Sequence, residues 1–373
     1  MADVPPDTLD FQSHVGLAGL AELRPAWLSL LRRIPSTQRM CHNPFWYQCY
    51  LRHLVANDAD MVFVGAYRQG QLAAVVPLTG RARSRWGFTL RTLELPSDRD
   101  LARGLCLRTV ACHATAQGLA RGDLLVLDHV MDDAHLFRAC IRRLTHDDTT
   151  VVGRCYHHAL APGFAVRDVI SSHFRKALNN KRNRLAKSGA VIHSASCTPT
   201  ECEASINDFL GVEASGWKGR SGAGSALAFD ASRVAFLREL LVGGDGLSCQ
   251  IHLLRAGRKP VAAAFCTLLD RVLYVLHIGF DEQFARMSPG QLLIHDLLTW
   301  ASLEGGIDEV NYLSGATWYD QWHPQSRDLC RTYGWPRNVR GLVATWAGRG
   351  ATRWAGPRNE GGRRAWLRHS GRA

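Results

Sequence analysis

The residues that point most clearly to a binding or catalytic role lie between positions 279 and 324. An apolar run there is followed by Ser288-Pro289-Gly290, and a helical pattern begins directly after these residues. Proline and glycine favour a tight turn at a helix start, and the first N–H groups of a helix have no partner within it. Together with the helix dipole, these groups form a site for an anion such as a pyrophosphate. An ordinary strand-to-helix crossover explains the same pattern equally well.

Two side chains outside that loop could move a proton. Glu213 lies four residues before Trp217 on a helical pattern, so both side chains point the same way. The Glu213 carboxylate could accept a proton, or it could form a structural ion pair with Lys218 or Arg220. His277 is a lone histidine in an apolar strand, a pattern more typical of a hydrogen-bonded core histidine than of a catalytic one.

Composition indicates a folded protein of more than one domain. The chain has 373 residues, of which 46% are hydrophobic and 21% charged. We expect a cytoplasmic protein, because the sequence shows no secretory signal and no run of about 18 apolar residues. Eleven cysteines occur without a CxxC pair, which predicts free thiols and no metal site.

The positive charge is concentrated near the C-terminus. The formal net charge is +12, and residues 346–373 hold seven arginines with Glu360 as their one acid. Glycines are frequent in the same segment. We expect a flexible basic tail that is solvated or contacts an anionic membrane or RNA. The protein could therefore be cytoplasmic and still associate with a membrane.

A second basic segment covers residues 171–189. Its helical pattern has an apolar stripe of Phe174, Leu178 and Leu185, with basic residues between them. Ser171 or Ser172 can cap its start, and Gly189 suits its end. Such a helix presents either an ordinary solvated face or a surface for an anionic substrate or RNA.

The order of expected elements occurs twice. The first half predicts strands over residues 61–68, 71–78, 89–95 and 123–128, with a helix over 106–117 before the last strand. The second half repeats this order with strands over 248–255, 260–269, 272–279 and 307–313 and a helix over 291–303. We therefore predict two α/β units with mixed sheets that meet near residues 155–170. The expected domains are a lead-in (1–40), two units (41–165 and 166–345) and the tail (346–373).

The second unit resembles the acyltransferase domain of the GNAT superfamily. More narrowly, it is similar to the CelD/BcsL-type acetyltransferases of cellulose and exopolysaccharide biosynthesis. These proteins and the Fem-type aminoacyl transferases are built from tandem GNAT-like domains. The resemblance covers residues 40–345, weakly in the first half. It rests on the basic helix ending Lys187-Ser188-Gly189, Glu213-xxx-Trp217-Lys218, the hairpin 255–265, Ser288-Pro289-Gly290, and Gly315-xxx-Tyr319-xx-Trp322.

The resemblance implies a site for acyl-CoA, with acetyl-CoA as the first choice and no metal. The strand 273–280 would diverge from its neighbour, so that His277, Ile278 and Gly279 line the acyl slot. The pyrophosphate would bind at Arg286, Ser288, Pro289, Gly290 and Gln291. Tyr319 would protonate the departing thiolate or pack as an aromatic lid, and Glu213 or His277 would take the acceptor proton. His323 is a weaker candidate. Residues implied for the acceptor are Trp217, Lys218, Asn311, Gly315 and Trp322.

Two positions depart from the family pattern. Asn311 stands where an aspartate is usual, and Asp320 where a lysine is usual. The Q/R-x-x-G-x-G/A phosphate signature is only partly present around residues 286–290. The first unit has no Ser-Pro-Gly step after its third strand, which indicates a degenerate copy.

The function expected from the resemblance is an acyl-CoA-dependent N- or O-acyltransferase. Its acceptor would be a small molecule, a sugar or a lipid-linked precursor of the envelope or an exopolysaccharide. Two alternatives stay open. One is a Fem-like transferase that uses aminoacyl-tRNA, which the basic helix and tail would suit. The other is a catalytically lapsed scaffold of a polysaccharide synthase.

Overall fold

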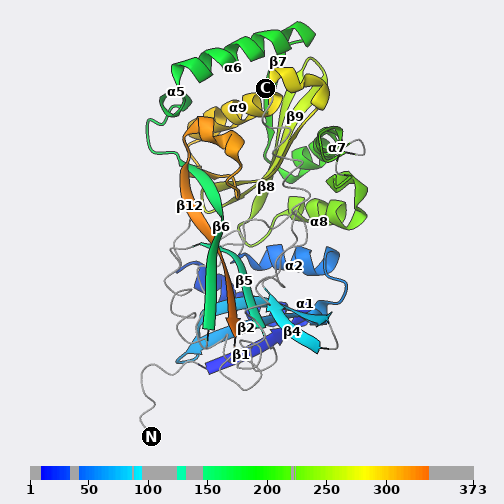
Figure 1. The fold of residues 1–373 in the computed structure, drawn as a ribbon, viewed down its shortest axis with the longest axis vertical. Helices are drawn as coiled ribbons and strands as arrows, with labels where there is room; N and C mark the ends of the chain where they lie inside the picture. Colours follow the sequence, from blue (N-terminus) through cyan, green and yellow to red (C-terminus); the bar gives the residue numbers. More distant parts are fainter. Residues whose placement is uncertain are drawn as a thin grey trace, which may run out of the picture.

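A single mixed sheet runs through the whole molecule. The computed structural model describes residues 10–33, 42–85, 88–94, 124–131, 146–219, 222 and 224–335. Within them, twelve strands pair in the order β1-β2-β3-β4-β5-β12-β6-β11-β10-β9-β8-β7. The molecule is elongated, with one unit at each end and the strands β6 and β12 running between them (Figure 1). This confirms the predicted α/β class with mixed sheets.

The first unit begins earlier in the sequence than expected. Residues 10–31 of the expected lead-in form a strand, paired with β2, and a helix packed on the same sheet. Asn43 caps the second helix by accepting hydrogen bonds from the N–H groups of Phe45 and Trp46, and Pro44 occupies the first turn. The elements are β1 (Asp10–Val15), α1 (Gly16–Leu31), α2 (Pro44–His53), η3 (Asp58–Asp60), β2 (Met61–Arg68), β3 (Gln71–Arg85), β4 (Phe88–Glu94), β5 (Leu124–Met131) and β6 (His146–Ala159).

The second unit follows the same order after two added helices. Those helices are α5 (Val166–Val169) and α6 (Ser172–Leu185), the latter capped by Ser171, one of the two predicted residues. The other elements are η5 (Ala186–Ser188), β7 (Val191–Ser196), α7 (Pro199–Ser215), η6 (Leu227–Phe229), α8 (Ala231–Val242), β8 (Ser248–Ala256), β9 (Lys259–Leu269), β10 (Val272–Phe280), η7 (Glu282–Met287), α9 (Pro289–Leu303), β11 (Glu309–Asn311), η8 (Thr317–Trp322) and β12 (Gln325–Trp335).

One of the two repeated hairpins differs from expectation by one residue. The turn between β2 and β3 lies at Gln69 and Gly70, as predicted, and both have positive φ angles. The turn between β8 and β9 lies at Gly257 and Arg258, one residue later than expected, with Gly257 at φ +62°. Glycine adopts this backbone conformation without steric cost, which fixes the turn in both copies.

The last strand of each unit pairs with the other unit. β6 lies between β11 and β12, and β12 lies between β5 and β6. β6 and β12 also run antiparallel to each other, from Gln325 opposite His157 to Trp335 opposite His146. Because each unit supplies a strand to its partner, the sheet is continuous across both units.

A hydrophobic core joins the helices of both units. It contains Trp27 of α1, Tyr47 of α2, Phe209 of α7 and Phe236 of α8. The Phe236 ring lies 5.1 Å from the Trp46 ring in an edge-to-face contact. A second core lies between β9, β10, α6 and α9. The units therefore cannot separate without exposing apolar surface, at about 25 cal/mol per Å².

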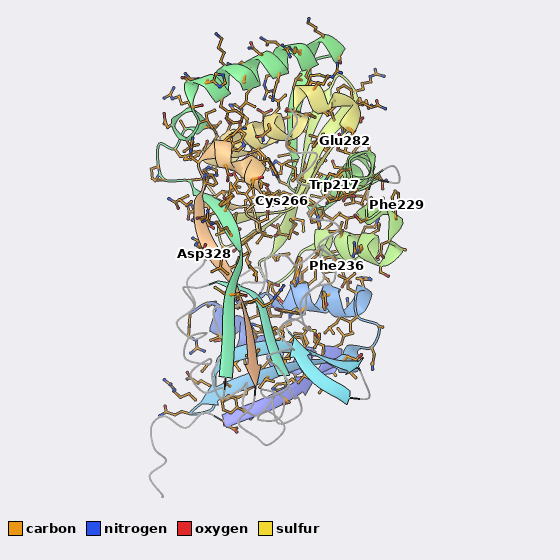
Figure 2. The ribbon with its side chains drawn as sticks, in the orientation of Figure 1. Trp217, Phe229, Phe236, Cys266, Glu282 and Asp328 are labelled. Atoms are coloured by element: carbon orange, nitrogen blue, oxygen red, sulfur yellow. The ribbon has the colours of Figure 1, made fainter. Side chains whose placement is uncertain are left out.

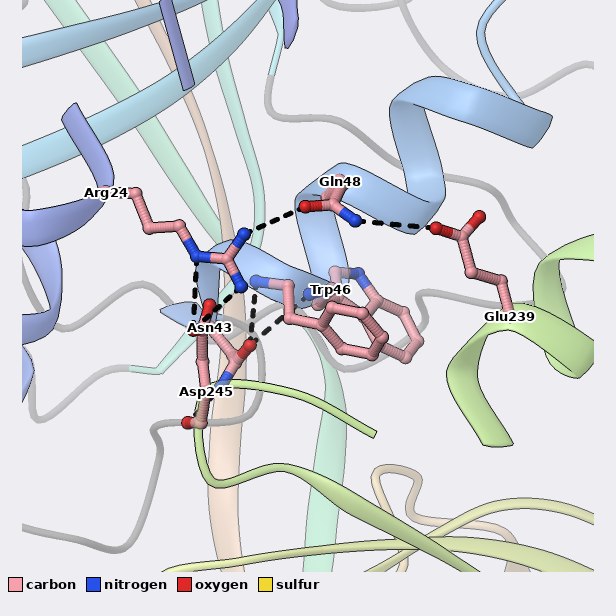
Figure 3. A network of polar contacts seen from close by, with 7 residues as sticks. Arg24, Asn43, Trp46, Gln48, Glu239 and Asp245 are labelled. Carbon is pink, nitrogen blue, oxygen red and sulfur yellow. Dashed lines mark hydrogen bonds and ion pairs between the residues drawn. The ribbon is translucent and has the colours of Figure 1, made fainter. Parts of the chain in front are cut away.

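Polar contacts reinforce this interface between the units (Figure 3). Arg24 donates to Asp245 at 2.8 Å and to Gln48 at 2.9 Å. On the neighbouring helix turn, Glu239 of α8 lies 2.5 Å from both Arg52 and His53 of α2. The Arg24–Asp245 and Arg52–Glu239 contacts join residues 221 and 187 positions apart in the sequence.

Several expectations lie outside the described residues. They include the helix over 106–117, the loop after the third strand of the first unit, Arg220 and the basic tail. No helix in the described part is both long and apolar enough to cross a membrane. The seven cysteines described there are free thiols.

Candidate active site

Strand β10 diverges from its neighbour β11 in the second unit. The two pair in parallel only where residues 272–274 lie opposite residues 309–311. β10 then continues to Phe280 with β9 as its registered partner. Residues 275–280 therefore present a backbone edge without a registered strand partner on the β11 side, among the strands described. Backbone N–H and C=O groups at such an edge can bind an extended ligand.

A bulge changes the direction of the β10 side chains. The register with β9 shifts between Val275 and His277. Before the bulge, Leu273 and Val275 pack in the α9 core; after it, Ile278 and Phe280 do so. The alternation of a strand then directs His277 and Gly279 toward α7. His277 is buried. This supports the expectation that residues 277–279 lie at the divergence.

Glu213 lies beside this part of β10. A Cβ atom built on Gly279 would be 3.0 Å from the Glu213 Cα, so α7 and β10 are in close contact there. The Glu213 side chain is buried, with one oxygen 3.0 Å from Lys218 Nζ and the other accepting the Leu227 N–H at 2.9 Å. The ion pair with Lys218 that the sequence allowed is therefore present, next to the candidate site.

Trp217 is an exposed aromatic residue of this region. It is 50% exposed, and Lys218 Nζ lies 5.9 Å from its ring centre. Trp217 lies on the α7 and α8 side of the sheet (Figure 2). An exposed tryptophan beside a buried ion pair can act as a platform for an apolar or sugar face.

The loop before α9 offers fewer free N–H groups than the expected pyrophosphate site. Ser288 has a left-handed backbone conformation with φ 46°, and α9 begins at Pro289. The N–H of Ser288 donates to Ala285 O, and the N–H of Gln291 donates to Ser288 O. Since proline has no N–H, Gly290 supplies the N–H of this turn that can face a ligand. Arg286 is exposed beside the loop.

Lys181 of α6 contacts this loop directly. Its Nζ donates to Ser288 Oγ at 2.8 Å. The sequence pattern groups Lys181 with the basic residues of this helix, which are expected to form either a solvated face or a surface for an anionic substrate or RNA. A signal was nevertheless present: position 181 follows Phe174 and Leu178 at helical spacing and precedes Leu185, so this lysine occupies the apolar stripe.

Gln291 holds the aromatic segment η8 against α9. Its side chain accepts from Trp322 Nε1 at 2.5 Å and donates to Trp318 O at 3.1 Å. Tyr319 is 2% exposed and lies 3.7 Å from Trp318 and 4.2 Å from Tyr312, measured between ring centres. Burial raises the pKa of Tyr319 above its usual value of 10. The hydroxyl therefore keeps its proton at neutral pH.

His158 of the first unit's last strand positions the same segment. Its Nε2 lies 2.9 Å from Trp322 O and its Nδ1 lies 2.8 Å from Tyr312 Oη. Because a carbonyl only accepts, Nε2 carries the hydrogen and the Tyr312 hydroxyl donates to Nδ1. Burial lowers the pKa of His158, which favours this neutral form. Sequence reasoning missed this residue, since nothing local links position 158 to position 322.

Asn311 takes part in a buried network at the end of β11. It donates to Glu309 at 2.9 Å, and its Oδ1 accepts from the Leu313 N–H. Arg327 of β12 contacts both oxygens of Glu309 at 3.2 Å. Cys155 of β6 contacts Asn311 at 3.3 Å. The carboxylate of this network therefore comes from Glu309, two residues before Asn311.

Gly315, Trp322 and His323 have structural surroundings as well. A Cβ atom on Gly315 would lie 2.7 Å from the Arg154 carbonyl oxygen. Trp322 is fully buried, and its ring contacts Phe174 of α6. His323 has a left-handed backbone at the end of η8. Gly315 and Trp322 therefore shape the region around the site. Gly315 allows the Arg154 backbone to approach closely, and the Trp322 side chain is buried.

The described residues also define what lies away from this region. No group of three or more His, Cys, Asp or Glu residues in the described part is arranged to hold a metal ion. A shallow cavity of about 490 Å³ lies between α7 and α8, lined by residues that include Pro199, Arg238 and Val242. The cavity adjoins the beginning of α7, whereas Glu213 meets Gly279 near the end of that helix.

Residues 172–322 match a family model described as an acetyltransferase (GNAT) domain. The match begins at α6 and ends at η8, so it contains β10, α9 and every candidate residue named above except His158 and His323. The second unit is a GNAT-type domain. No curated protein matches the chain by sequence.

Solved structures support the same fold over both units. FemX is 9% identical, has a TM-score of 0.53, and the alignment covers 90% of this chain and 99% of that one. A C-terminal (DUF2156) domain from Agrobacterium fabrum is 10% identical, with a TM-score of 0.52 and coverage of 89% and 96%. A protein of unknown function from Bacteroides thetaiotaomicron is 13% identical, with a TM-score of 0.50 and coverage of 88% and 100%. At these identities the likeness concerns the fold alone.

Proposed function

We propose that the protein is an acyl-CoA-dependent acyltransferase, with acetyl-CoA as its donor. The observation that carries this proposal is the backbone edge of β10 at residues 275–280, which diverges from β11 beside the start of α9. A pantetheine chain can pair with such an edge while the diphosphate lies near the helix N-terminus. The GNAT-type domain supports the use of acyl-CoA as co-substrate.

The reaction needs little covalent participation by the protein. The nitrogen or oxygen of the acceptor attacks the thioester carbonyl carbon, the C–S bond breaks, and the acyl group stays on the acceptor. The acceptor loses one proton, and the departing thiolate gains one. Holding both reactants in position can supply about 7–11 kcal/mol of barrier lowering. A base near the acceptor and a hydrogen-bond donor near the sulfur supply the rest.

We assign the donor side to one surface of the site. Ile278 and Gly279 would line the acyl slot, and Arg286, Ser288, Pro289, Gly290 and Gln291 would surround the diphosphate. The contact between Gly290 and Phe280 supports this assignment, because a Cβ on Gly290 would lie 3.4 Å from the Phe280 ring. The helix start is thus in contact with the diverging end of β10.

We assign the proton transfers to Glu213 and Tyr319, with His277 as a further candidate base. The Glu213 carboxylate lies next to Gly279 and can take the acceptor proton once Lys218 yields to the acceptor. Tyr319 stays protonated at neutral pH, so it suits donation to a thiolate and not proton abstraction.

For the acceptor, we propose a sugar or lipid-linked hydroxyl or amine of an envelope or exopolysaccharide precursor. The exposed ring of Trp217 supports this choice, since an aromatic face packs well on a sugar ring. The resemblance to CelD/BcsL-type acetyltransferases supports it too. Lys218 would orient the acceptor, while Asn311, Gly315 and Trp322 would shape the pocket from within. The basic tail, outside the described residues, could hold the protein at an anionic membrane.

A second candidate is transfer of an amino acid from aminoacyl-tRNA. The exposed face of α6, which includes Arg175 and Arg184 and has no acidic residue, favours it. Basic residues on a helix can contact phosphates of a nucleic acid. The FemX likeness agrees in fold.

Two measurements test the proposal. Calorimetry with CoA measures donor binding, and release of free thiol from acetyl-CoA is followed with a panel of amino sugars and sugar alcohols. We expect CoA binding and thiol release that depends on both protein and acceptor, with the product mass raised by one acetyl group. Binding without turnover on any acceptor would favour the lapsed scaffold. No CoA binding together with consumption of aminoacyl-tRNA would favour the second candidate.

A further inference from the structure

The helix α6 places a lysine where its other inward positions are apolar. Phe174, Leu178 and Leu185 are buried in the second core. Lys181 shares their face of the helix, is half-buried, and reaches Ser288 Oγ at 2.8 Å. A lysine stem can pack on apolar neighbours while its ammonium group emerges elsewhere. Here the ammonium group emerges at the loop that precedes α9.

The charges around Lys181 are unbalanced. Its neighbour Arg182 is paired with Asp296 of α9. Unlike Arg182, Lys181 has no carboxylate within 4.0 Å of its Nζ among the described residues. Burial lowers the pKa of Lys181, and the charge of Arg184 adds to this effect. The N-terminal end of α9 contributes further positive potential at the same point. An anion bound there would relieve this repulsion.

The backbone of the loop offers little to an anion by itself. Ser288 and Gln291 use their N–H groups within the turn, and Pro289 has none. The phosphate signature of the family is also only partly present in residues 286–290. A diphosphate therefore finds one glycine N–H, from Gly290, and needs a further donor. Lys181 contacts this loop through Ser288 Oγ and can supply that donor beside the exposed Arg286.

We propose that Lys181 is a specificity-determining residue that binds the diphosphate of the donor, in place of the missing loop N–H groups. This inference rests on the proposed use of acyl-CoA. The ammonium group would donate to phosphate oxygens while Ser288 keeps it in position. The protein would then favour thioesters of CoA over thioesters of shorter carriers that lack the diphosphate. α6, which precedes the repeated elements of the unit, would be part of the donor site.

The test compares three ligands and four proteins by calorimetry. The ligands are CoA, 3′-dephospho-CoA, which keeps the diphosphate, and pantetheine, which has no phosphate. The proteins are the wild type, Lys181→Met, Lys181→Arg and the control Lys176→Met, which removes an exposed lysine of the same helix. Unfolding temperatures of all four establish that the fold is intact.

We expect Lys181→Met to weaken CoA and 3′-dephospho-CoA about tenfold or more, the effect of one charge-assisted contact. Pantetheine should bind all four proteins equally, and Lys181→Arg should retain most of the CoA affinity. Lys176→Met should match the wild type. A loss for CoA but not for 3′-dephospho-CoA would instead place Lys181 at the 3′-phosphate and overturn the diphosphate assignment.

Three other outcomes overturn the inference in distinguishable ways. If the wild type binds CoA and Lys181→Met binds it equally well, the role of Lys181 is wrong while the proposed function stands. If the folded wild type binds no CoA at all, the proposed function falls and takes this inference with it. Equal weakening of pantetheine and CoA would show that Lys181 only supports the local structure.

Discussion

Strands β4 and β10 are the same element in the two units, and their surroundings differ. Each pairs in parallel with the following strand over three residues, 92–94 with 124–126 and 272–274 with 309–311. In the first unit these are the last residues of β4. In the second they are the first residues of β10, which continues for six more. The second unit therefore has the longer free edge within the described residues.

The hairpins next to these strands are alike even in their irregularities. The register shifts near the turn in both, at Ala66/Tyr67 in the first unit and at Leu254/Arg255 in the second. The shift at Val275/His277 in β10, however, has no equivalent in the pairing of β3 with β4. The bulge in β10 is thus a further difference between the units, and it turns His277 and Gly279 toward Glu213.

The largest effect should come from Glu213, which the bulge brings next to Gly279. Glu213→Gln keeps the side-chain shape and can still accept from the Leu227 N–H, but it cannot take a proton. We expect turnover to fall by about 10²–10⁴, as for loss of a positioned base, with CoA affinity unchanged. Glu203→Gln, on the exposed side of the same helix, is the control. Full activity of Glu213→Gln would show that Glu213 is not the base, so that either His277 takes the acceptor proton or no side chain is needed for this step.

Tyr319→Phe should have the next largest effect. The ring packing against Trp318 and Tyr312 survives this change, so the unfolding temperature should stay nearly constant. Turnover should fall by about 10², because the thiolate loses its hydrogen-bond donor. Steady-state rates at saturating acetyl-CoA measure the effect. A phenylalanine variant as active as the wild type would make Tyr319 a packing residue only.

Asn311→Asp tests how the exchanged strands stabilise the second unit. The new carboxylate would face Glu309 in a buried site, where Arg327 already pairs with that residue. We expect a loss of about 1–3 kcal/mol in the free energy of unfolding, from repulsion and lost donation by the amide. Denaturant titration measures it, with Asn179→Asp on the exposed face of α6 as control. Higher activity without lost stability would contradict the network as described and support the usual family pattern.

Gly290→Asp should weaken CoA binding about tenfold, or about 1.4 kcal/mol. The added carboxylate would repel the diphosphate, and its Cβ would press against Phe280. Gly211→Asp is a suitable control, because a Cβ at Gly211 meets nothing within 4 Å. Calorimetry with CoA decides the outcome. An unchanged dissociation constant in a folded variant would remove the donor from the start of α9.

Much of this architecture could be predicted from local patterns. The Gln69-Gly70 turn, the strand alternation and the Ser288-Pro289-Gly290 step each specify their own structure within a few residues. The repeat followed from their order. The exchange of β6 and β12 could not be predicted, because pairing between residues such as His157 and Gln325 leaves no local pattern. The bulge at Leu276 was also hidden, since apolar residues surround it on both sides.

The candidate site was predicted less completely than the fold. Glu213 and Gly279 were both named, but their contact depends on how α7 packs on β10. Lys181 was identifiable from its place in the apolar stripe of α6, and only the tertiary fold gives that position a function. Tyr319 and Trp322 were recognised as aromatic residues near the site, whereas their burial comes from α6 and β6 covering them.

The smallest effect we predict concerns the contact between the two units. Burial opposes ionisation of Glu239, but hydrogen bonds from Arg52 and His53 outweigh it and hold the pKa of Glu239 below its usual 4.5. A carboxyl group with a lowered pKa in the folded state stabilises the fold above pH 4.5, and this stability is lost as pH falls through the folded value. Glu239→Gln should therefore cost about 1 kcal/mol at pH 7 and reduce the loss of stability between pH 5 and 3. Urea titrations across this range measure it, with Glu203→Gln as control. An acid slope identical to that of the wild type would show that the contacts of Glu239 do not help to join the units.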